Sequence, residues 1–374
     1  MSLRAIARRF GRTDSTVRLW VLRAGDTRLA RIDWSDRPSG NPHPIRTSAT
    51  RETAILALRE WLRKHSSLGE CGAAAIRHAL LVSGQLAPCA RTIARILARH
   101  GVARVQRQRR PAPPAGWYLP DLAAARAELD SFDFVEGLAF RGGSHFDALT
   151  AISLWGSLSG AWPLPSGANS PRTRQLLEAH WRKWRLPRYA QFDNDAVFQG
   201  SHGHPAHLGR IVHFCLCLGV IPIFTPPREQ GFQNKLESFN AYWQQKVWQR
   251  RPFRNHRELA RSNDAFLRAH QAKHASRREA APPRTPFPRV LARSPAADRV
   301  IFLRRADHKA KVSLCSQTFT LPSSYAYRLV RCEWHLRRQK LFVFALHRRH
   351  PEDQRLLRQI PWKIALTPWF STPR

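Results

Sequence analysis

The hydrophobic pattern is clearest over residues 189–240, where short apolar runs alternate with polar turns. The run 189–192 alternates and is followed by Asp-Asn-Asp at 193–195, which predicts a buried strand with Asp193 at its exposed carboxyl end. A helix opened by Asn-Lys-Leu-Glu at 234–237 closes the stretch. We therefore expect Asp193 and Glu237 to lie close together.

The elements around these two carboxylates follow the same patterns. Residues 210–218 are apolar with a helical period that ends at Gly219, and 220–224 predict a strand closed by two prolines. Asn169 begins an earlier helix, with proline in its first turn. Three more strands are predicted further upstream, at 131–135, 146–153 and 159–163.

Acidic residues on separate elements of a basic chain suit a pair of hard divalent cations, which prefer carboxylate oxygen and keep positions open for phosphate. Such a site needs a third carboxylate upstream. Asp133 is the best candidate because it lies within the first predicted strand. The alternatives are Asp130, Glu136 and Asp147.

The order of strands, helices and carboxylates resembles the catalytic core of retroviral integrases, which bacterial insertion-sequence transposases share. The matching positions are Asp133 in Phe-Asp-Phe, Asp193 in Asp-Asn-Asp, and Glu237 in Gln-Asn-Lys-Leu-Glu-Ser-Phe-Asn, where that family places its Asp-Asp-Glu (DDE) triad. Two features depart from the family. Asp195 stands where the family usually has glycine, and the separation of 44 residues (237 − 193) is longer than usual. The surplus is easily placed in the loop 200–209.

The resemblance implies a DDE transposase or integrase with an RNase H-like core, which cleaves the ends of a mobile element and joins the freed 3′-hydroxyl to target DNA. It implies two Mg²⁺ (or Mn²⁺) ions held by Asp133, Asp193 and Glu237, and no nucleotide cofactor. The implied partners are double-stranded DNA, as element ends and as target, and further copies of the chain in a homo-oligomer on DNA. A sequence-specific DNA-binding regulator, or a catalytically inactive transposase derivative, is the alternative. An RNase H-like nuclease acting on RNA or hybrids is a third hypothesis.

Composition supports a polyanionic partner. The 374 residues include 62 Lys and Arg against 26 Asp and Glu, a formal charge of +36, which makes nucleic acid the expected partner. A membrane is not expected, because no apolar run is long enough to span a bilayer and residues 1–12 lack a signal peptide's apolar centre. We expect a cytoplasmic, nucleoid-associated bacterial protein. The six cysteines contain no Cys-x-x-Cys pair, so reduced thiols are expected and no zinc site is indicated.

Two helical segments precede the predicted core. Residues 3–10 and 15–23 predict a helix-turn-helix whose second helix can enter the major groove. Three amphipathic helices are predicted between 49 and 104, and they resemble a second such module. The side chains expected to contact DNA are Arg12, Ser15, Arg18, Arg23 and Arg91, together with Lys235 and Lys246 on the Glu237 helix.

After the core, short strands at regular spacing suggest a small β-barrel, and transposases of this type often carry a DNA-binding barrel there. The expected fold is therefore multidomain, with all-α helix-turn-helix modules, an α/β RNase H-like core with a mixed sheet, and a C-terminal barrel. The expected segments are a helix-turn-helix module at 1–30, a linker at 31–48, a second module at 49–104, a basic proline-rich linker at 105–120, the catalytic core at 121–275, a linker at 276–298, the barrel at 299–350 and a tail at 351–374.

Overall fold

The computed structural model describes residues 2–33, 35, 47–102, 114–200, 208–229, 231–292 and 294–362. Its internal contacts divide the chain into two compact units, Met1–Leu56 and Ala57–Arg374. Within the described ranges, none of the helices combines the length and the apolar character needed to cross a membrane.

The first unit begins with the two helices expected from the sequence. Helix α1 spans Leu3–Arg9 and helix α2 spans Asp14–Ala24, followed by a short 3-10 turn, η1, at Leu29–Arg31. The Thr13 hydroxyl accepts the backbone N–H of Thr16, which caps the start of α2. The two helices lie against each other, and each buries a single residue, Ala7 or Val17.

The next three expected helices are also present. Helix α3, Ala49–His65, crosses the division between the units, and α4 and α5 span Ala73–Val82 and Ala90–Arg99. Helices α4 and α5 lie against each other. Buried Ile93, Ile96 and Leu97 give α5 its apolar face.

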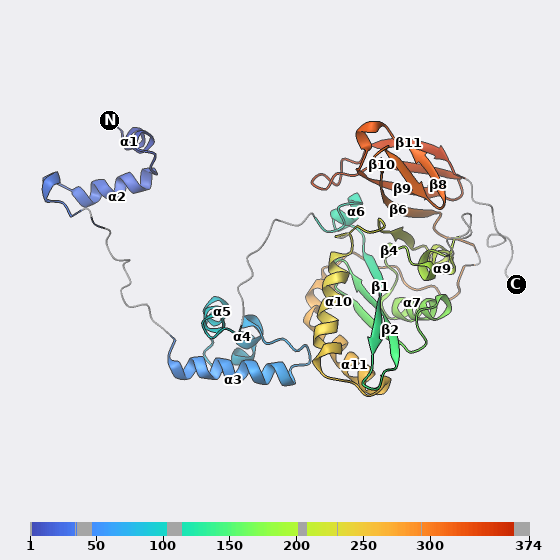
Figure 1. The fold of residues 1–374 in the computed structure, drawn as a ribbon, viewed down its shortest axis with the longest axis horizontal. Helices are drawn as coiled ribbons and strands as arrows, with labels where there is room; N and C mark the ends of the chain where they lie inside the picture. Colours follow the sequence, from blue (N-terminus) through green and yellow to red (C-terminus); the bar gives the residue numbers. More distant parts are fainter. Residues whose placement is uncertain are drawn as a thin grey trace. The chain divides into compact units, whose positions relative to one another are not determined.

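The second unit is built on one mixed sheet of nine strands (Figure 1). Neighbours run parallel from β1 through β4 and β5 to β6, and the remaining pairs are antiparallel. The order across the sheet is β11-β10-β9-β6-β5-β4-β1-β2-β3. The bounds are β1 Leu129–Ala139, β2 His145–Ser153, β3 Ser159–Leu164, β4 Tyr189–Phe192, β5 Ile221–Phe224, β6 Arg299–Arg305, β9 Leu329–His335, β10 Lys340–Ala345 and β11 Leu356–Pro361.

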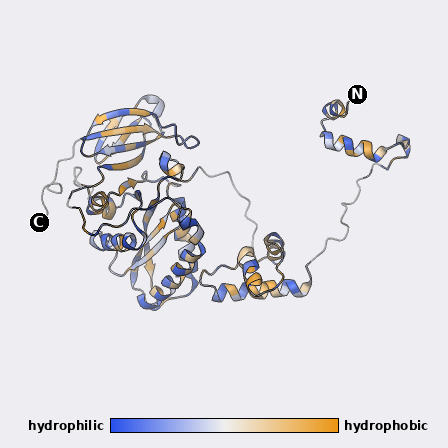
Figure 2. Cartoon of the chain, turned by 180° about the vertical axis from the view of Figure 1, so that it is seen from behind, coloured by the Kyte–Doolittle hydropathy of each residue, from blue (hydrophilic) through white to orange (hydrophobic). Residues whose placement is uncertain are grey.

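Helices cover both faces of the central strands, which explains why these strands are almost continuously apolar. Phe132 points into the cluster shared with α7 and α9, whereas Val135 points into the cluster shared with α10 and α11. Hydrophobic residues are concentrated in the strands and hydrophilic ones on the flanking helices (Figure 2). The helices of this unit after α5 are α6 Pro120–Ala123, α7 Ser170–Trp184, α8 Ala196–Gln199, α9 Arg210–Cys217, α10 Asn234–Lys246, η2 Trp248–Arg250, α11 His256–Lys273 and α12 Ala275–Glu279.

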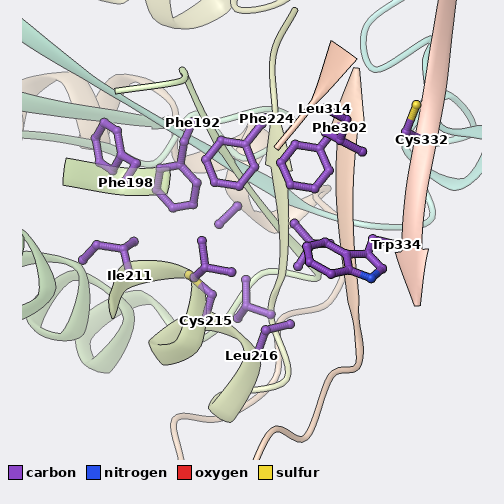
Figure 3. Packing of buried hydrophobic residues seen from close by; sticks show 14 of the residues in the cluster. Phe192, Phe198, Ile211, Cys215, Leu216, Phe224, Phe302, Leu314, Cys332 and Trp334 are labelled. Atoms are coloured by element: carbon purple, nitrogen blue, oxygen red, sulfur yellow. The ribbon is translucent and has the colours of Figure 1, made fainter. Parts of the chain in front are cut away.

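The C-terminal strands differ from the expected separate barrel. In the part of the chain that the structure describes, β6 pairs with β5 and extends the core sheet, and only the hairpin β7 (Lys311–Leu314) and β8 (Gln317–Thr320) stands apart from it. A short 3-10 turn, η3 at Ser323–Tyr325, follows the hairpin. Strand β6 joins the core sheet because it shares the hydrophobic core of β5. Phe302 of β6 stacks on Phe224 of β5, with 5.2 Å between ring centroids (Figure 3).

Two segments that the sequence presents as connectors pack on this unit. Thr285, in the expected linker 276–298, forms a β-bridge with Leu186. Strand β11 occupies part of the expected tail, and Trp362 just after it is buried. Ile364 and Trp369 of the same expected tail lie outside the described residues.

Candidate active site

The register of two parallel strands brings Asp133 and Asp193 to one edge of the sheet. Ser131 on β1 pairs with Gln191 on β4. Asp133 follows Ser131 by two residues, and Asp193 follows Gln191 by two residues. Because side chains alternate along a strand, both aspartates share a face with Ser131 and Gln191. This is the face that α10 covers, at the point where β4 ends and β1 continues beyond it.

Helix α10 meets this edge through Asn240. Its side-chain Nδ2 donates a hydrogen bond of 3.0 Å to Oδ2 of Asp133, and its buried Oδ1 has no partner among the described residues. Glu237 lies three residues earlier on α10, so the two side chains lie on the same side of the helix. The Glu237 side chain is exposed.

Both aspartates have raised pKa values. Burial, followed by the negative charge of Asp193, raises the pKa of Asp133 to about 6. The pKa of Asp193 is also raised, first by burial and then by the charges of Asp195 and Glu136. A divalent cation between these carboxylates would offset the negative charge that contributes, after burial, to both raised pKa values.

Asp130 is excluded from this edge by its own contacts. Its carboxylate is fully buried on the opposite face, where Arg284 donates two hydrogen bonds at 2.9 and 2.6 Å and Trp181 donates a third at 2.9 Å. Burial alone would raise the pKa of Asp130, but the guanidinium holds it below its usual value. Asp147, another alternative, accepts the backbone N–H of Gly137 at 3.3 Å. Asp130 therefore has a structural role as a buried ion pair.

Two carboxylates and an orphaned amide oxygen fit an oxygen-preferring divalent cation at this edge. In the described ranges, no three His, Cys, Asp or Glu side chains come close enough together to hold a metal ion. Glu237 would therefore have to turn its exposed side chain inward to provide the third carboxylate ligand. Glutamate has the length and freedom for such a rotation at little cost.

The two departures from the family pattern have local explanations. Asp195 caps the short helix α8, since its carboxylate accepts the backbone N–H of Val197 at 2.6 Å. The inserted loop closes at its base, where the Gly209 N–H donates to the Gln199 carbonyl at 2.9 Å. A Cβ on Gly200 would meet the Gly209 backbone at 2.8 Å, so the close approach requires glycine. Residues 201–207 of this loop lie outside the described residues.

Arg304 links the C-terminal strands to the Asp193 turn, and the sequence reasoning missed it. From β6, its guanidinium donates to Asn194 Oδ1 at 2.9 Å and to the Thr225 carbonyl at 3.2 Å. Asn194 Nδ2 in turn donates to the Thr225 carbonyl at 2.7 Å. Nothing local in the sequence marks Arg304, whereas Asn240 could have been found from its three-residue spacing after Glu237.

The seven side chains expected to contact DNA have different surroundings. Four of them are exposed: Arg12 in the turn between α1 and α2, Ser15 and Arg18 on α2, and Arg91 on α5. Arg23 is half-buried and donates to the Ser35 carbonyl. The other two are half-buried lysines that donate to backbone carbonyls: Lys235 to Leu154, and Lys246 to Gly69 at 3.1 Å. Burial lowers the pKa of Lys235 to about 8.

Comparison with known proteins gives little further information. No family model and no curated protein matches this chain. Among solved structures, the cryoEM structure of simian T-cell lymphotropic virus intasome in complex with PP2A regulatory subunit B56 gamma aligns with 83% of this chain and 97% of that chain, at 13% sequence identity and a TM-score of 0.34. The function proposed next therefore rests on the geometry of the site.

Proposed function

We propose that this protein is a DNA transposase or integrase of the DDE type, which cleaves the ends of a mobile element and transfers the freed 3′-hydroxyl to target DNA. The observation that carries the proposal is the convergence of Asp133 and Asp193 at one edge of the sheet, with α10 held against them by the Asn240–Asp133 hydrogen bond. Glu237 on α10 is the third member of the proposed triad.

The charge distribution supports the same function. A chain with a net charge of +36 attracts the phosphate backbone, yet the proposed centre is acidic, and no arginine in the described part of the chain pairs with it as Arg284 pairs with Asp130. Carboxylates repel the phosphate groups of DNA unless a metal cation lies between carboxylate and phosphate. An acidic centre on a DNA-binding surface is therefore better explained by metal-assisted phosphoryl transfer than by DNA binding alone.

In the proposed mechanism, Asp133, Asp193 and Glu237 would hold two Mg²⁺ (or Mn²⁺) ions. Bound there, the ions would activate the attacking oxygen and stabilise the leaving oxygen of a phosphodiester. Asn240 orients the Asp133 carboxylate by donating to one of its oxygens. Arg304 fixes the turn that carries Asp193 through Asn194.

The proposed DNA contacts divide into two kinds. Arg12, Ser15 and Arg18 would contact DNA from the first helical pair and Arg91 from α5, where exposed side chains can reach bases or phosphates. Lys235 and Lys246 would bind phosphate beside the catalytic edge after leaving their backbone carbonyls. Joining two element ends to one target needs two active sites, so the working complex would be a homo-oligomer.

The test is nicking of DNA that carries the repeats flanking the gene, with Mg²⁺ or Mn²⁺ against EDTA. Wild-type protein should nick only with divalent metal, and Glu237→Gln should bind the same DNA without nicking it. Metal-independent binding with no nicking by the wild-type protein would instead identify a DNA-binding regulator or an inactive derivative. Adding Glu237→Gln protomers to wild-type protein should poison strand transfer, whereas undiminished activity would contradict the oligomer.

A further inference from the structure

A pocket of about 650 Å³ opens beside the proposed catalytic edge. Ser131 on β1 and Gln191 on β4 form part of its wall, and they precede Asp133 and Asp193 by two residues, with the side chains on the same face. Two residues of strand span about 7 Å. The pocket is therefore next to the carboxylates, at a distance that a neighbouring nucleotide of a bound strand can cover.

Aromatic side chains give the pocket flat apolar surfaces. Trp117, Tyr118 and Phe232 pack on one another with ring centroids 5.5 to 6.1 Å apart, and all three line the pocket. Trp155 lines it as well, and its Nε1 has no hydrogen-bond partner among the described residues. Such walls favour a flat ring with polar edges over an aliphatic chain.

The polar and charged groups of the pocket are suited to a nucleotide. Its two charged lining residues are Lys235 and Arg277, and no carboxylate is among the described residues that line it. Ser131 donates to Gln191 Oε1 at 3.0 Å, and Gln191 Nε2 donates to the Tyr118 hydroxyl at 2.9 Å. The Tyr118 hydroxyl proton and the second amide proton of Gln191 are left to donate to acceptors on a base edge.

We propose that this pocket takes one unstacked base of the DNA strand, with the adjoining phosphate near Lys235 and Arg277, while the next phosphate along the strand approaches Asp133 and Asp193. The inference deepens the proposed function, on which it rests, by naming a base-binding subsite. Withdrawing a base from the duplex would also bend the strand toward the carboxylates. Sequence preference beside the cleaved bond would follow from which base fits.

The experiment compares binding of two single strands by the full-length protein in EDTA. One is a fluorescent oligothymidylate of about 10 nucleotides, and the other is an abasic strand with the same number of phosphates. Because stacking of one base contributes about 1–3 kcal/mol, wild type should bind the thymidylate about 5- to 100-fold more tightly. The free nucleotide dAMP should compete for the site, and deoxyribose 5-phosphate should not.

The decisive variant is Ala280→Trp, which fills the pocket from an exposed lining position. It should abolish the preference for thymidylate over the abasic strand, and Trp155→Ala should reduce it. Ala280→Ser and Trp61→Ala are the matched controls: serine at position 280 is too small to fill the pocket, and Trp61 does not line it, so both variants should keep the preference. Equal binding of the two strands by wild type, or an intact preference in Ala280→Trp, would overturn the proposal. Since EDTA is present throughout, failure of metal-dependent nicking leaves this result unaffected.

Discussion

Asn240 donates a side-chain hydrogen bond of 3.0 Å to Asp133, although 107 residues separate them in the chain. The bond attaches α10 to the middle of β1, where Asp133 and Asp193 each follow the paired residues Ser131 and Gln191 by two positions. Among the described residues, the Asp133 carboxylate has no basic hydrogen-bond partner, whereas Asp130 on the opposite face of the same strand is neutralised by Arg284. The contrast between these two aspartates gives the first prediction.

Asp130→Asn should destabilise the fold, because it leaves Arg284 buried without its counter-charge. Losing one partner of a buried pair costs about 3–5 kcal/mol. Asp133→Asn should keep or raise the melting temperature, since it removes a carboxylate whose pKa is raised to about 6 by burial and by Asp193. Thermal unfolding measured by circular dichroism checks both variants.

In the nicking assay, Asp133→Asn should be inactive while folded, as should Asp193→Asn. Full activity of folded Asp133→Asn would remove this residue from the proposed triad. Asp195→Asn is the control, because asparagine also caps a helix and should leave both stability and nicking unchanged.

Arg304→Lys should slow nicking by about 10- to 100-fold, because an ammonium cannot bridge Asn194 and the Thr225 carbonyl as a guanidinium does. The Mg²⁺ concentration needed for half-maximal activity should also rise, since the turn carrying Asp193 is less fixed. The neighbouring Arg305→Lys is the control, because Arg305 pairs with Glu229 away from that turn. Equal nicking rates for the two variants would contradict a positioning role for Arg304.

Glu333 should give stability that depends on pH. Burial alone would raise its pKa, but a hydrogen bond from His335 and the charges of Arg331 and Arg299 lower it to about 2. A depressed folded-state pKa adds stability above the unfolded value of 4.5, and that stability is lost as pH falls toward 2.

Glu333→Gln should therefore lower the free energy of unfolding at pH 7 by as much as about 3 kcal/mol, and the difference should shrink as pH is lowered from about 4.5 toward 2. Denaturant titrations at several pH values measure it. Glu352→Gln is the control, since that side chain is 76% exposed and its pair with His350 is a surface pair. A difference in the free energy of unfolding between wild type and Glu333→Gln that stays constant with pH would contradict this role of Glu333.

DNA affinity should fall steeply with salt, because a chain with a charge of +36 displaces many counterions from the phosphate backbone. Several phosphate contacts imply a loss of about a hundredfold or more between low and moderate salt. Fluorescence anisotropy with random duplex DNA measures the slope, and a flat profile would argue against backbone binding. Removing residues 2–48 should chiefly reduce discrimination between element ends and random DNA, since base reading is assigned to that segment.

The local elements of this protein can be predicted from its amino-acid sequence alone. Strand β4 has the bounds that alternation predicted, and α7 begins after its Asn169 cap as the proline in its first turn indicated. These features depend on the period of apolar side chains, on helix capping and on the restricted backbone of proline. Each of these acts within a few residues, so a short stretch of sequence is enough to predict it. The placement of Asp133 within a strand and of Asp193 directly after one followed from the same signals.

How these elements pack into a common core depends on contacts between residues that are far apart in the sequence. Whether Asp130 or Asp133 faces α10 depends on the face of β1 that each side chain takes, and Arg284, the partner that neutralises Asp130, is more than 150 residues away. The extension of the core sheet by β6 depends on Phe302 stacking against Phe224 of β5, a contact between residues distant in sequence. Short amphipathic strands can close into a barrel or join an existing sheet, because both arrangements satisfy the same alternation, and burial against a particular neighbour selects between them.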